Sequence, residues 1–290
     1  MLCKSPFMIG SLPCRCGRCI CCRVNHRRTW TLRMMLEAKK HQENCVATLT
    51  YRNRRLPKGG TLVADHVQRW IKRIRKDLAP QKIRYFLAGE YGKRTARPHF
   101  HVVLFGIGRA IAGGVDGRGG LVRKHWWYGN TFVDGLSDEA VSYVAGYVTK
   151  KLTNEERAKR NVGREFIRMS LRPGIGAPAV GDIARSLDSG FGRLSVDESG
   201  DVPFALRVGS RVFGLGRYLR GKLREKVLGS AEAPKQKTRE YWQEMWKLRR
   251  SAARSQGKAK SFKEWLVSRD AQGILNMEKR LEILSDKDKF

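Results

Sequence analysis

Two histidines separated by one residue, His99 and His101, have the spacing for metal chemistry. They lie in the apolar stretch from Arg97 to Phe105, where alternation along a strand puts both imidazoles on one face, about 7 Å apart. Such a pair can hold one metal ion with a third ligand from a neighbouring strand, and Glu90, at the end of the preceding predicted strand, is the candidate. Two structural histidines are the alternative, but the chain has only six, and two in register favour a metal or catalytic pair. The same donor set occurs in non-haem iron oxygenases.

Two tyrosines, Tyr143 and Tyr147, stand four residues apart in a predicted helix, and Lys151 continues their stripe. Packing against a sheet is the usual reason for such a stripe. A phenol has an ordinary pKa near 10 and is a weak nucleophile at neutral pH, but a nearby lysine or metal favours the phenolate. With the metal pair and a very basic chain, the tyrosines predict metal-assisted attack on a DNA phosphodiester.

Five of the seven cysteines lie within the nine residues from Cys14 to Cys22. A reducing compartment favours thiolate ligands over disulfides. The spacing allows a four-thiolate zinc set with a Cys-x2-Cys step, although adjacent cysteines leave other ligand sets open and a metal-free loop is the alternative. That set is Cys3, Cys16, Cys19 and Cys22. Arginines around these cysteines are candidates for holding DNA phosphates, namely Arg15, Arg18, Arg23, Arg27 and Arg28.

The composition indicates a polyanionic partner. The chain has 59 Lys and Arg against 27 Asp and Glu, a net charge of +32, whereas solubility asks for a net charge of only about 2–8 in a small domain. Cationic side chains that neutralise phosphates release counterions, so nucleic acid is the expected partner. No apolar run reaches the roughly 18–20 residues of a membrane span, and the first residues lack a signal-peptide pattern. We therefore expect an intracellular protein without a membrane partner.

Hydrophobic patterns predict an α+β fold, an antiparallel sheet with helices on one face. Predicted strands cover 45–51, 83–90 and 98–105, and predicted helices cover 27–41, 63–78 and 137–151. Residues 106–120 are rich in glycine and are expected to form a loop, and Ser137 is the expected N-cap of the third helix. Residues 153–230 are harder to assign, whereas 235–290 are charged and periodic, which indicates helices.

Three motifs, in this order, resemble those of HUH-type rolling-circle replication initiators. They are Leu49-Thr50-Tyr51, Arg97-Pro98-His99-Phe100-His101 and the segment from Tyr143 to Lys151. The chain is most similar to the replication initiation protein of microviruses, particularly the gokushovirus group. Further similar stretches are Cys16-Gly17-Arg18-Cys19, Gly89-Glu90-Tyr91-Gly92 and the segment from Arg168 to Gly176. The resemblance covers about residues 1–176.

This resemblance implies a ferredoxin- or RRM-like HUH endonuclease domain with the His-x-His strand in the middle. It implies that His99 and His101 bind a divalent metal, with Glu90 as the inferred third ligand. Since imidazoles suit softer ions, we expect Mn²⁺ to serve at least as well as Mg²⁺. One tyrosine would cut the origin strand and keep the 5′-phosphate, and the other would cut the displaced strand so that it closes into a circle. Some relatives carry lysine where this chain has Gly146, so Lys150 or Lys151 would supply the charge, a choice that stays open.

The same resemblance selects Cys3, Cys16, Cys19 and Cys22 for a structural zinc site. It implies origin or single-stranded DNA as substrate, host helicase and polymerase as partners, and the host bacterial cytoplasm as location. The predicted segments are a Cys-rich knuckle at 1–26, the endonuclease domain at 27–176, an irregular or β extension at 177–234 and a basic helical region at 235–290. Alternatives are a relaxase or transposase with the same chemistry, and a zinc-stabilised nucleic-acid-binding protein without catalysis.

Overall fold

The structure is a computed structural model that describes residues 3–10, 12–92, 95–148, 162–232, 234–255 and 262–287, apart from the side chains of 12, 235–239 and 280–287. Contacts divide the chain into two units, Arg27–Gly181 and a second that joins Met1–His26 to Asp182–Phe290. None of the helices in the described ranges is long and apolar enough to cross a membrane. The division into four segments made from the sequence stays a prediction.

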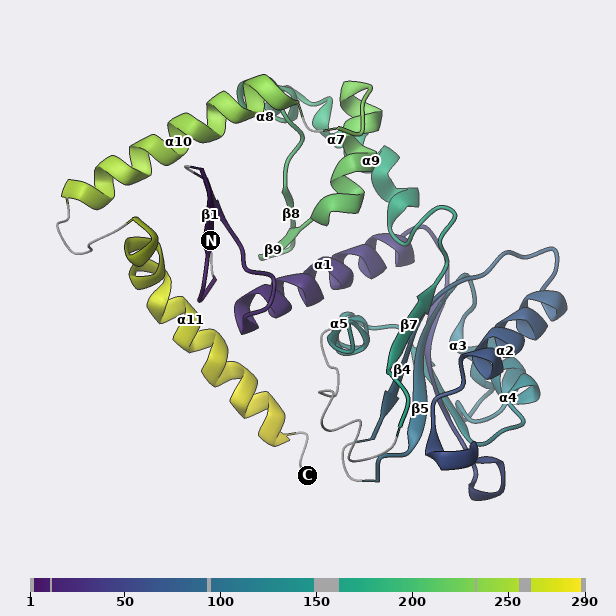
Figure 1. The fold of residues 1–290 in the computed structure, drawn as a ribbon. Coiled ribbons are helices and arrows are strands. Elements are labelled where there is room, and N and C mark those ends of the chain that lie inside the picture. Colours follow the sequence, from purple (N-terminus) through teal and green to yellow (C-terminus); the bar gives the residue numbers. More distant parts are fainter. Residues whose placement is uncertain are drawn as a thin grey trace. The chain divides into compact units, whose positions relative to one another are not determined.

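The unit Arg27–Gly181 contains an antiparallel five-stranded sheet with the order β6-β3-β5-β4-β7 (Figure 1). The α+β class and the antiparallel sheet expected from the sequence are confirmed. The His-x-His strand, β5, is the middle strand, with two neighbours on each side. The bounds of the five strands are β3 (Asn44–Thr50), β4 (Arg84–Tyr91), β5 (Pro98–Phe105), β6 (Thr131–Gly135) and β7 (Phe166–Met169).

Helices cover both faces of this sheet, so the expectation of helices on one face is wrong. Phe100, Val102 and Leu104 of β5 pack in one core cluster with α2 (Ala64–Asp77). Val103 and Phe105 of the same strand pack in another cluster with α1 (Ile20–Ala38) and α5 (Asp138–Gly146). All five side chains are fully buried, and a strand buried on both faces is apolar at every position. Figure 1 shows α1 and α5 on one side of the sheet and α2 on the other.

The clusters define two sides of the sheet, which we call the α5 face and the α2 face. His99 and His101 belong to the α5 face because they alternate with Phe100 and Val102 and are in phase with Val103. α2 presents Val67, Trp70, Ile71 and Ile74 to the α2 face, as the predicted stripe indicates.

Several element bounds differ from those predicted. α1 begins at Ile20, seven residues before the predicted start, because the second half of the cysteine segment is already helical. The glycine-rich stretch 106–120, predicted as a loop, contains α3 (Arg109–Gly113) and the start of α4 (Gly120–His125). α5 ends at Gly146, short of the predicted 151; Tyr147 is its C-cap, and residues 149–161 lie outside the described ranges.

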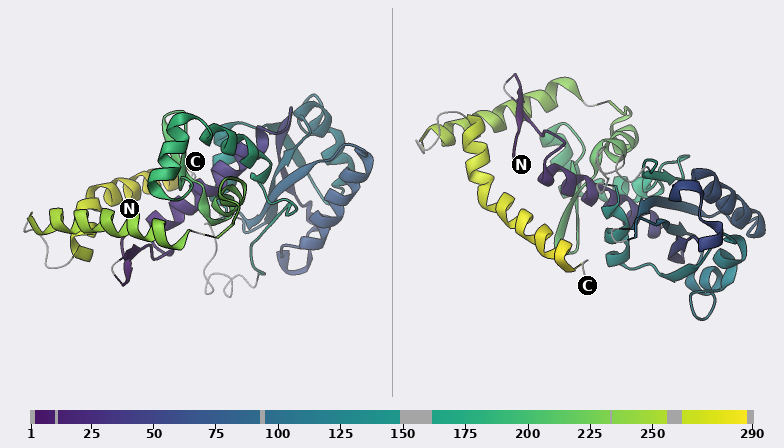
Figure 2. Two further views of the ribbon diagram at one scale, coloured as in Figure 1. Left: turned by 90° about the horizontal axis from the view of Figure 1, so that it is seen from above. Right: turned by 60° about the horizontal axis from the view of Figure 1, so that its bottom comes forward.

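The second unit is mainly helical in the described ranges, together with two short hairpins. Three helices occupy most of 177–234, where irregular or β structure was predicted: α7 (Val180–Leu187), α8 (Gly190–Ser199) and α9 (Gly216–Leu228). The hairpins are β1 (Phe7–Ile9) with β2 (Leu12–Cys14), and β8 (Ala205–Val208) with β9 (Arg211–Gly214). Figure 2 shows the long helices α10 (Lys235–Ser255) and α11 (Phe262–Lys287), as the C-terminal periodicity predicts.

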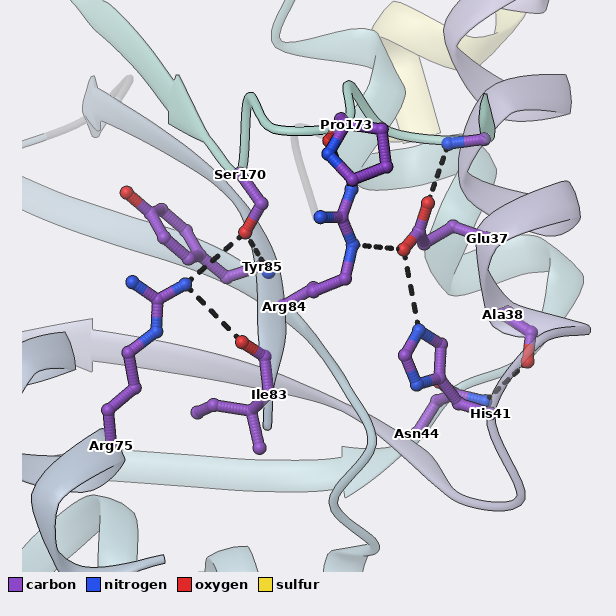
Figure 3. Close-up of polar contacts among 11 residues, drawn as sticks. Glu37, Ala38, His41, Asn44, Arg75, Ile83, Arg84, Tyr85, Ser170 and Pro173 are labelled. Carbon is purple, nitrogen blue, oxygen red and sulfur yellow. Dashed lines mark hydrogen bonds and ion pairs between the residues drawn. The ribbon is translucent and has the colours of Figure 1, made fainter. Parts of the chain in front are cut away.

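A buried carboxylate anchors the loop after β7, which is part of the similar stretch Arg168–Gly176. Glu37 of α1 is fully buried and accepts hydrogen bonds from Arg84 Nε and from the backbone N–H of Gly176, the latter at 2.7 Å. Arg84 also donates to the carbonyl of Pro173 at 2.6 Å, and His41 Nε2 lies 3.4 Å from Glu37 (Figure 3). These contacts tie the loop to the sheet and to α1.

Candidate active site

The register of the central strands brings the predicted metal ligands together. Glu90 of β4 lies directly opposite His99 of β5, and His101 follows two residues later on the same face. Glu90 Oε1 is 2.8 Å from His99 Nε2 and 3.5 Å from His101 Nε2. Glu90 and His101 are buried, whereas His99 is partly exposed. The site is therefore accessible from the side of His99.

The other ring nitrogen of each histidine has a partner that fixes the ring. His99 Nδ1 lies 3.1 Å from the carbonyl oxygen of Arg97, and His101 Nδ1 lies 3.3 Å from the hydroxyl of Thr48. A hydrogen bond at Nδ1 selects the tautomer that leaves Nε2 available for a metal. Sequence reasoning did not identify Thr48, although its alternation with Thr50 on the strand next to the histidines is a usable signal.

The donor set suits a divalent ion. Three ligand atoms about 2.1 Å from one ion lie roughly 3 to 4 Å from one another, and the ligand atoms of Glu90, His99 and His101 all lie within 4.8 Å of one another. One carboxylate and two imidazoles suit Mn²⁺ better than Mg²⁺, which prefers oxygen ligands. These three residues fit the predicted metal site, and the identity of the metal stays a prediction.

Both tyrosines of α5 contact the metal-ligand strand. The Tyr147 ring stacks on His101 with centroids 4.6 Å apart and planes 7° apart, and the Tyr143 ring meets His101 edge-on at 5.5 Å. The two rings are 5.2 Å apart. Their environments differ, because Tyr143 is 53% exposed and Tyr147 only 6%. Burial, with the charge of Glu90 next in importance, raises the pKa of Tyr147 well above the ordinary range.

α5 is positioned by its cap and by a contact with α1. Ser137 Oγ accepts from Ala140 N at 3.1 Å, so the predicted N-cap is confirmed. Arg27 donates to the Ser142 carbonyl at 3.0 Å and to its hydroxyl at 3.2 Å. A Cβ at Gly146 would lie 3.5 Å from the guanidinium carbon of Arg27. Arg27 therefore brings a positive charge to the helix that carries the tyrosines.

The lysines predicted to supply this charge, Lys150 and Lys151, lie outside the described residues. Among the predicted DNA-binding arginines, Arg15, Arg18 and Arg23 are exposed, and Arg28 is half-buried. Arg27 is half-buried against α5, so its described contacts orient a helix. The predicted phosphate contacts of these arginines stay predictions.

Four cysteines of the second unit form a separate cluster, and they are the four selected from the sequence. The sulfur atoms of Cys3, Cys16, Cys19 and Cys22 lie within 4.8 Å of one another, and three of the sulfur pairs are 3.7 to 3.9 Å apart. Sulfurs about 2.3 Å from a tetrahedral zinc ion lie about 3.8 Å apart. The geometry of this four-cysteine cluster therefore suits zinc.

Backbone N–H groups support the four-cysteine cluster. Cys16 N donates to Cys3 Sγ at 3.4 Å, and Cys19 N donates to Cys16 Sγ at 3.3 Å. The N–H groups of Cys19 and Arg18 lower the pKa of Cys16 to about 6, which makes its thiolate available at neutral pH. Cys14 and Cys21 are outside the cluster.

Comparisons with known proteins agree with this arrangement. Residues 44–152, from β3 to just beyond α5, match the family described as Replication-associated protein ORF2. The chain is 31% identical over 156 residues to replication-associated protein ORF4 of Chlamydia phage 1, covering 49% of this chain and 39% of that protein. It is 29% identical over 189 residues to replication-associated protein ORF2 of Spiroplasma virus 4, covering 60% and 58%.

A third relative is replication-associated protein VP4 of Bdellovibrio phage phiMH2K, with 30% identity over 158 residues, 50% of each chain. The chain spans about half the length of the curated relatives it matches. No solved structure matches it significantly. These findings confirm the resemblance to the replication proteins of microviruses.

Proposed function

We propose that this protein initiates rolling-circle replication of a microvirus genome by nicking origin DNA through a tyrosine of α5. The observation that carries the proposal is the contact of Tyr143 and Tyr147 with His101, one of three residues whose donor atoms suit a divalent metal. The net charge of +32 supports a DNA substrate. The relatives named as replication-associated proteins support the biological process.

The chemistry is a transfer of the phosphoryl group to a phenol. The phenolic oxygen attacks the phosphorus, a tyrosine O–P bond forms, and the P–O3′ bond breaks. The phenolic proton is lost and the 3′ oxygen gains one, which leaves a 5′-phosphotyrosine and a free 3′-OH. Glu90, His99 and His101 would hold a divalent ion, Mn²⁺ or Mg²⁺, whose role is to offset charge that develops on the phosphate. Thr48 and the Arg97 carbonyl keep the two imidazoles oriented.

Tyr143 is the proposed nucleophile of the first cut. Its ring is half exposed at the edge of the ligand set, where a DNA strand can reach its hydroxyl. Tyr147 is buried and stacked on His101, so it needs the first tyrosine or the strand to move before it reacts. Tyr147 would cut the displaced strand after one round, and the released 3′-OH would attack the first phosphotyrosine and close the circle. The free 3′-OH left by the first cut would prime a host polymerase, with a host helicase as the second partner.

Covalent capture tests this proposal. The full chain is incubated with 5′-blocked, 3′-labelled single-stranded origin DNA and Mn²⁺, denatured, and separated by electrophoresis. We expect a DNA-linked band that requires the metal, disappears in His99→Gln and remains in His66→Gln, since His66 lies on α2 away from the ligand set. Tight, salt-sensitive binding with no linked band on a verified origin would instead support a non-catalytic, zinc-stabilised binding protein.

A further inference from the structure

A basic loop directly follows β3 at the end of the sheet that holds the candidate metal site. Arg52, Arg54 and Arg55 are all exposed, and no Asp or Glu occurs from residue 44 to residue 64. None of the three arginines has an acidic partner among the residues that the structure describes. Three exposed like charges repel one another, so they favour an anionic ligand.

Arg52 points toward the face that carries the metal ligands. In β3, Thr48 contacts His101 and Thr50 lies opposite His99, whereas Leu49 and Tyr51 are buried on the α2 face. Arg52 is the next residue in this alternation and has extended backbone angles, φ −76° and ψ 156°. Its side chain therefore continues the row of Thr48 and Thr50 beyond the end of the strand.

Arg97 fixes the loop to the metal ligands. Its guanidinium donates to Asn53 Oδ1 and to the Tyr51 carbonyl, both at 2.7 Å, and its own carbonyl lies 3.1 Å from His99 Nδ1. One residue thus connects the loop on one side and a metal ligand on the other. This connection keeps the distance between the arginines and the site constant.

An exposed tryptophan lies in the chain segment next to the loop. The backbone N–H of Arg52 donates to the Tyr128 carbonyl at 3.0 Å, and the neighbouring Trp127 is 53% exposed. The Arg73 guanidinium lies 3.9 Å from the centre of the Trp127 ring and donates to the His125 carbonyl at 3.1 Å. Trp127 is therefore held in place at the surface, as a platform for stacking a base requires.

We propose that Arg52, Arg54 and Arg55 bind the phosphates of single-stranded DNA next to the nicked phosphate, and that Trp127 stacks one of its bases. This inference rests on the proposed function for the identity of the strand. An unpaired strand is the better ligand because a ring can stack on a base only where its face is open. The loop would thus select single-stranded over duplex DNA.

The test is binding of fluorescent 20-nucleotide single-stranded DNA to the full chain, measured by anisotropy at several salt concentrations without added divalent ion. The variant is Arg52→Gln/Arg54→Gln, and the control is Lys72→Gln/Lys76→Gln, which removes two exposed charges from α2. Each lost phosphate contact lowers the salt slope by about 0.7, so the variant should lose about 1.4 in slope and about 25-fold in affinity at 0.1 M salt. The control should change affinity by less than about threefold.

Trp127→Leu should weaken single-strand binding about tenfold and change duplex binding less than about twofold. Equal losses in the loop variant and the lysine control, or an unchanged salt slope in the loop variant, would overturn the proposal. The outcomes for nicking are separate, because binding is measured without the metal. If the wild type forms no covalent adduct but the loop variant loses affinity, the nickase is wrong and the loop is right; an adduct with unchanged binding means the reverse.

Discussion

The substitution Glu37→Gln tests the packing that holds the α5 face together. Glu37 is fully buried and accepts from Arg84, from the Gly176 N–H and from the His41 side chain. A glutamine has the same shape but no charge, and its NH2 group would meet at least one of these donors. Arg84, whose side chain is 16% exposed, would keep its charge without a carboxylate partner.

Breaking a buried ion pair by removing one partner costs about 3–5 kcal/mol. Arg84 also donates to the Pro173 carbonyl and is not completely buried, so we expect the lower end, about 3 kcal/mol, for the unit Arg27–Gly181. Glu43→Gln is the matched control, because Glu43 is an exposed glutamate on the same side of the chain before β3. Exposed substitutions of this kind usually change stability by less than about 0.5 kcal/mol.

Urea unfolding followed by tryptophan fluorescence measures the stability change, and hydrogen exchange localises it. In Glu37→Gln the peptide containing Gly176 should exchange faster, since its N–H loses its carboxylate acceptor. Peptides from α10 should exchange as in the wild type. If Glu37→Gln were as stable as Glu43→Gln and the exchange of Gly176 were unchanged, the buried carboxylate would not anchor the loop.

Two further predictions concern the second unit. Cys19→Ser should abolish the binding of one zinc per chain, measured by mass spectrometry of the native protein, whereas Cys14→Ser, outside the four-cysteine cluster, should retain it; retention in both variants would argue against this ligand set. Asp201, whose side chain is 4% exposed, pairs with Arg224 and Arg220. Burial raises the pKa of Asp201, but these two arginines lower it further, so its net pKa is below the usual value. The pair therefore stabilises the unit above pH of about 4 and loses this contribution as the pH falls below it. Asp201→Asn should cost about 3 kcal/mol at pH 7 and flatten the acid limb of the stability profile, and an unchanged acid limb would contradict the assignment.

The sequence was sufficient to predict the elements that carry the site. Alternation in β5 predicts that His99 and His101 share a face, and Ser137 predicts the start of α5, because both signals are local. The opposite position of Glu90 and His99 depends on strand register, which a short turn between two adjacent strands makes predictable.

Features that depend on packing between distant segments were not predictable. Coverage of both sheet faces was missed, although the unbroken apolar run from Phe100 to Phe105 is a signal for it. The contact of Arg27 with Ser142 joins residues 115 positions apart, and no local pattern indicates it. The same holds for the buried carboxylate of Glu37, since a lone glutamate in a helix is usually solvated.

Mapping the DNA-linked residue tests the central claim most directly. The covalent complex formed with origin DNA is digested with nuclease and trypsin, and the peptide containing α5 is sequenced by tandem mass spectrometry. We predict a nucleotide mass on Tyr143 in the wild type and its loss in Tyr143→Phe, with Tyr128→Phe as control. A nucleotide on any residue outside α5 would contradict the account, and one on Tyr147 alone would reverse the proposed order of the two tyrosines.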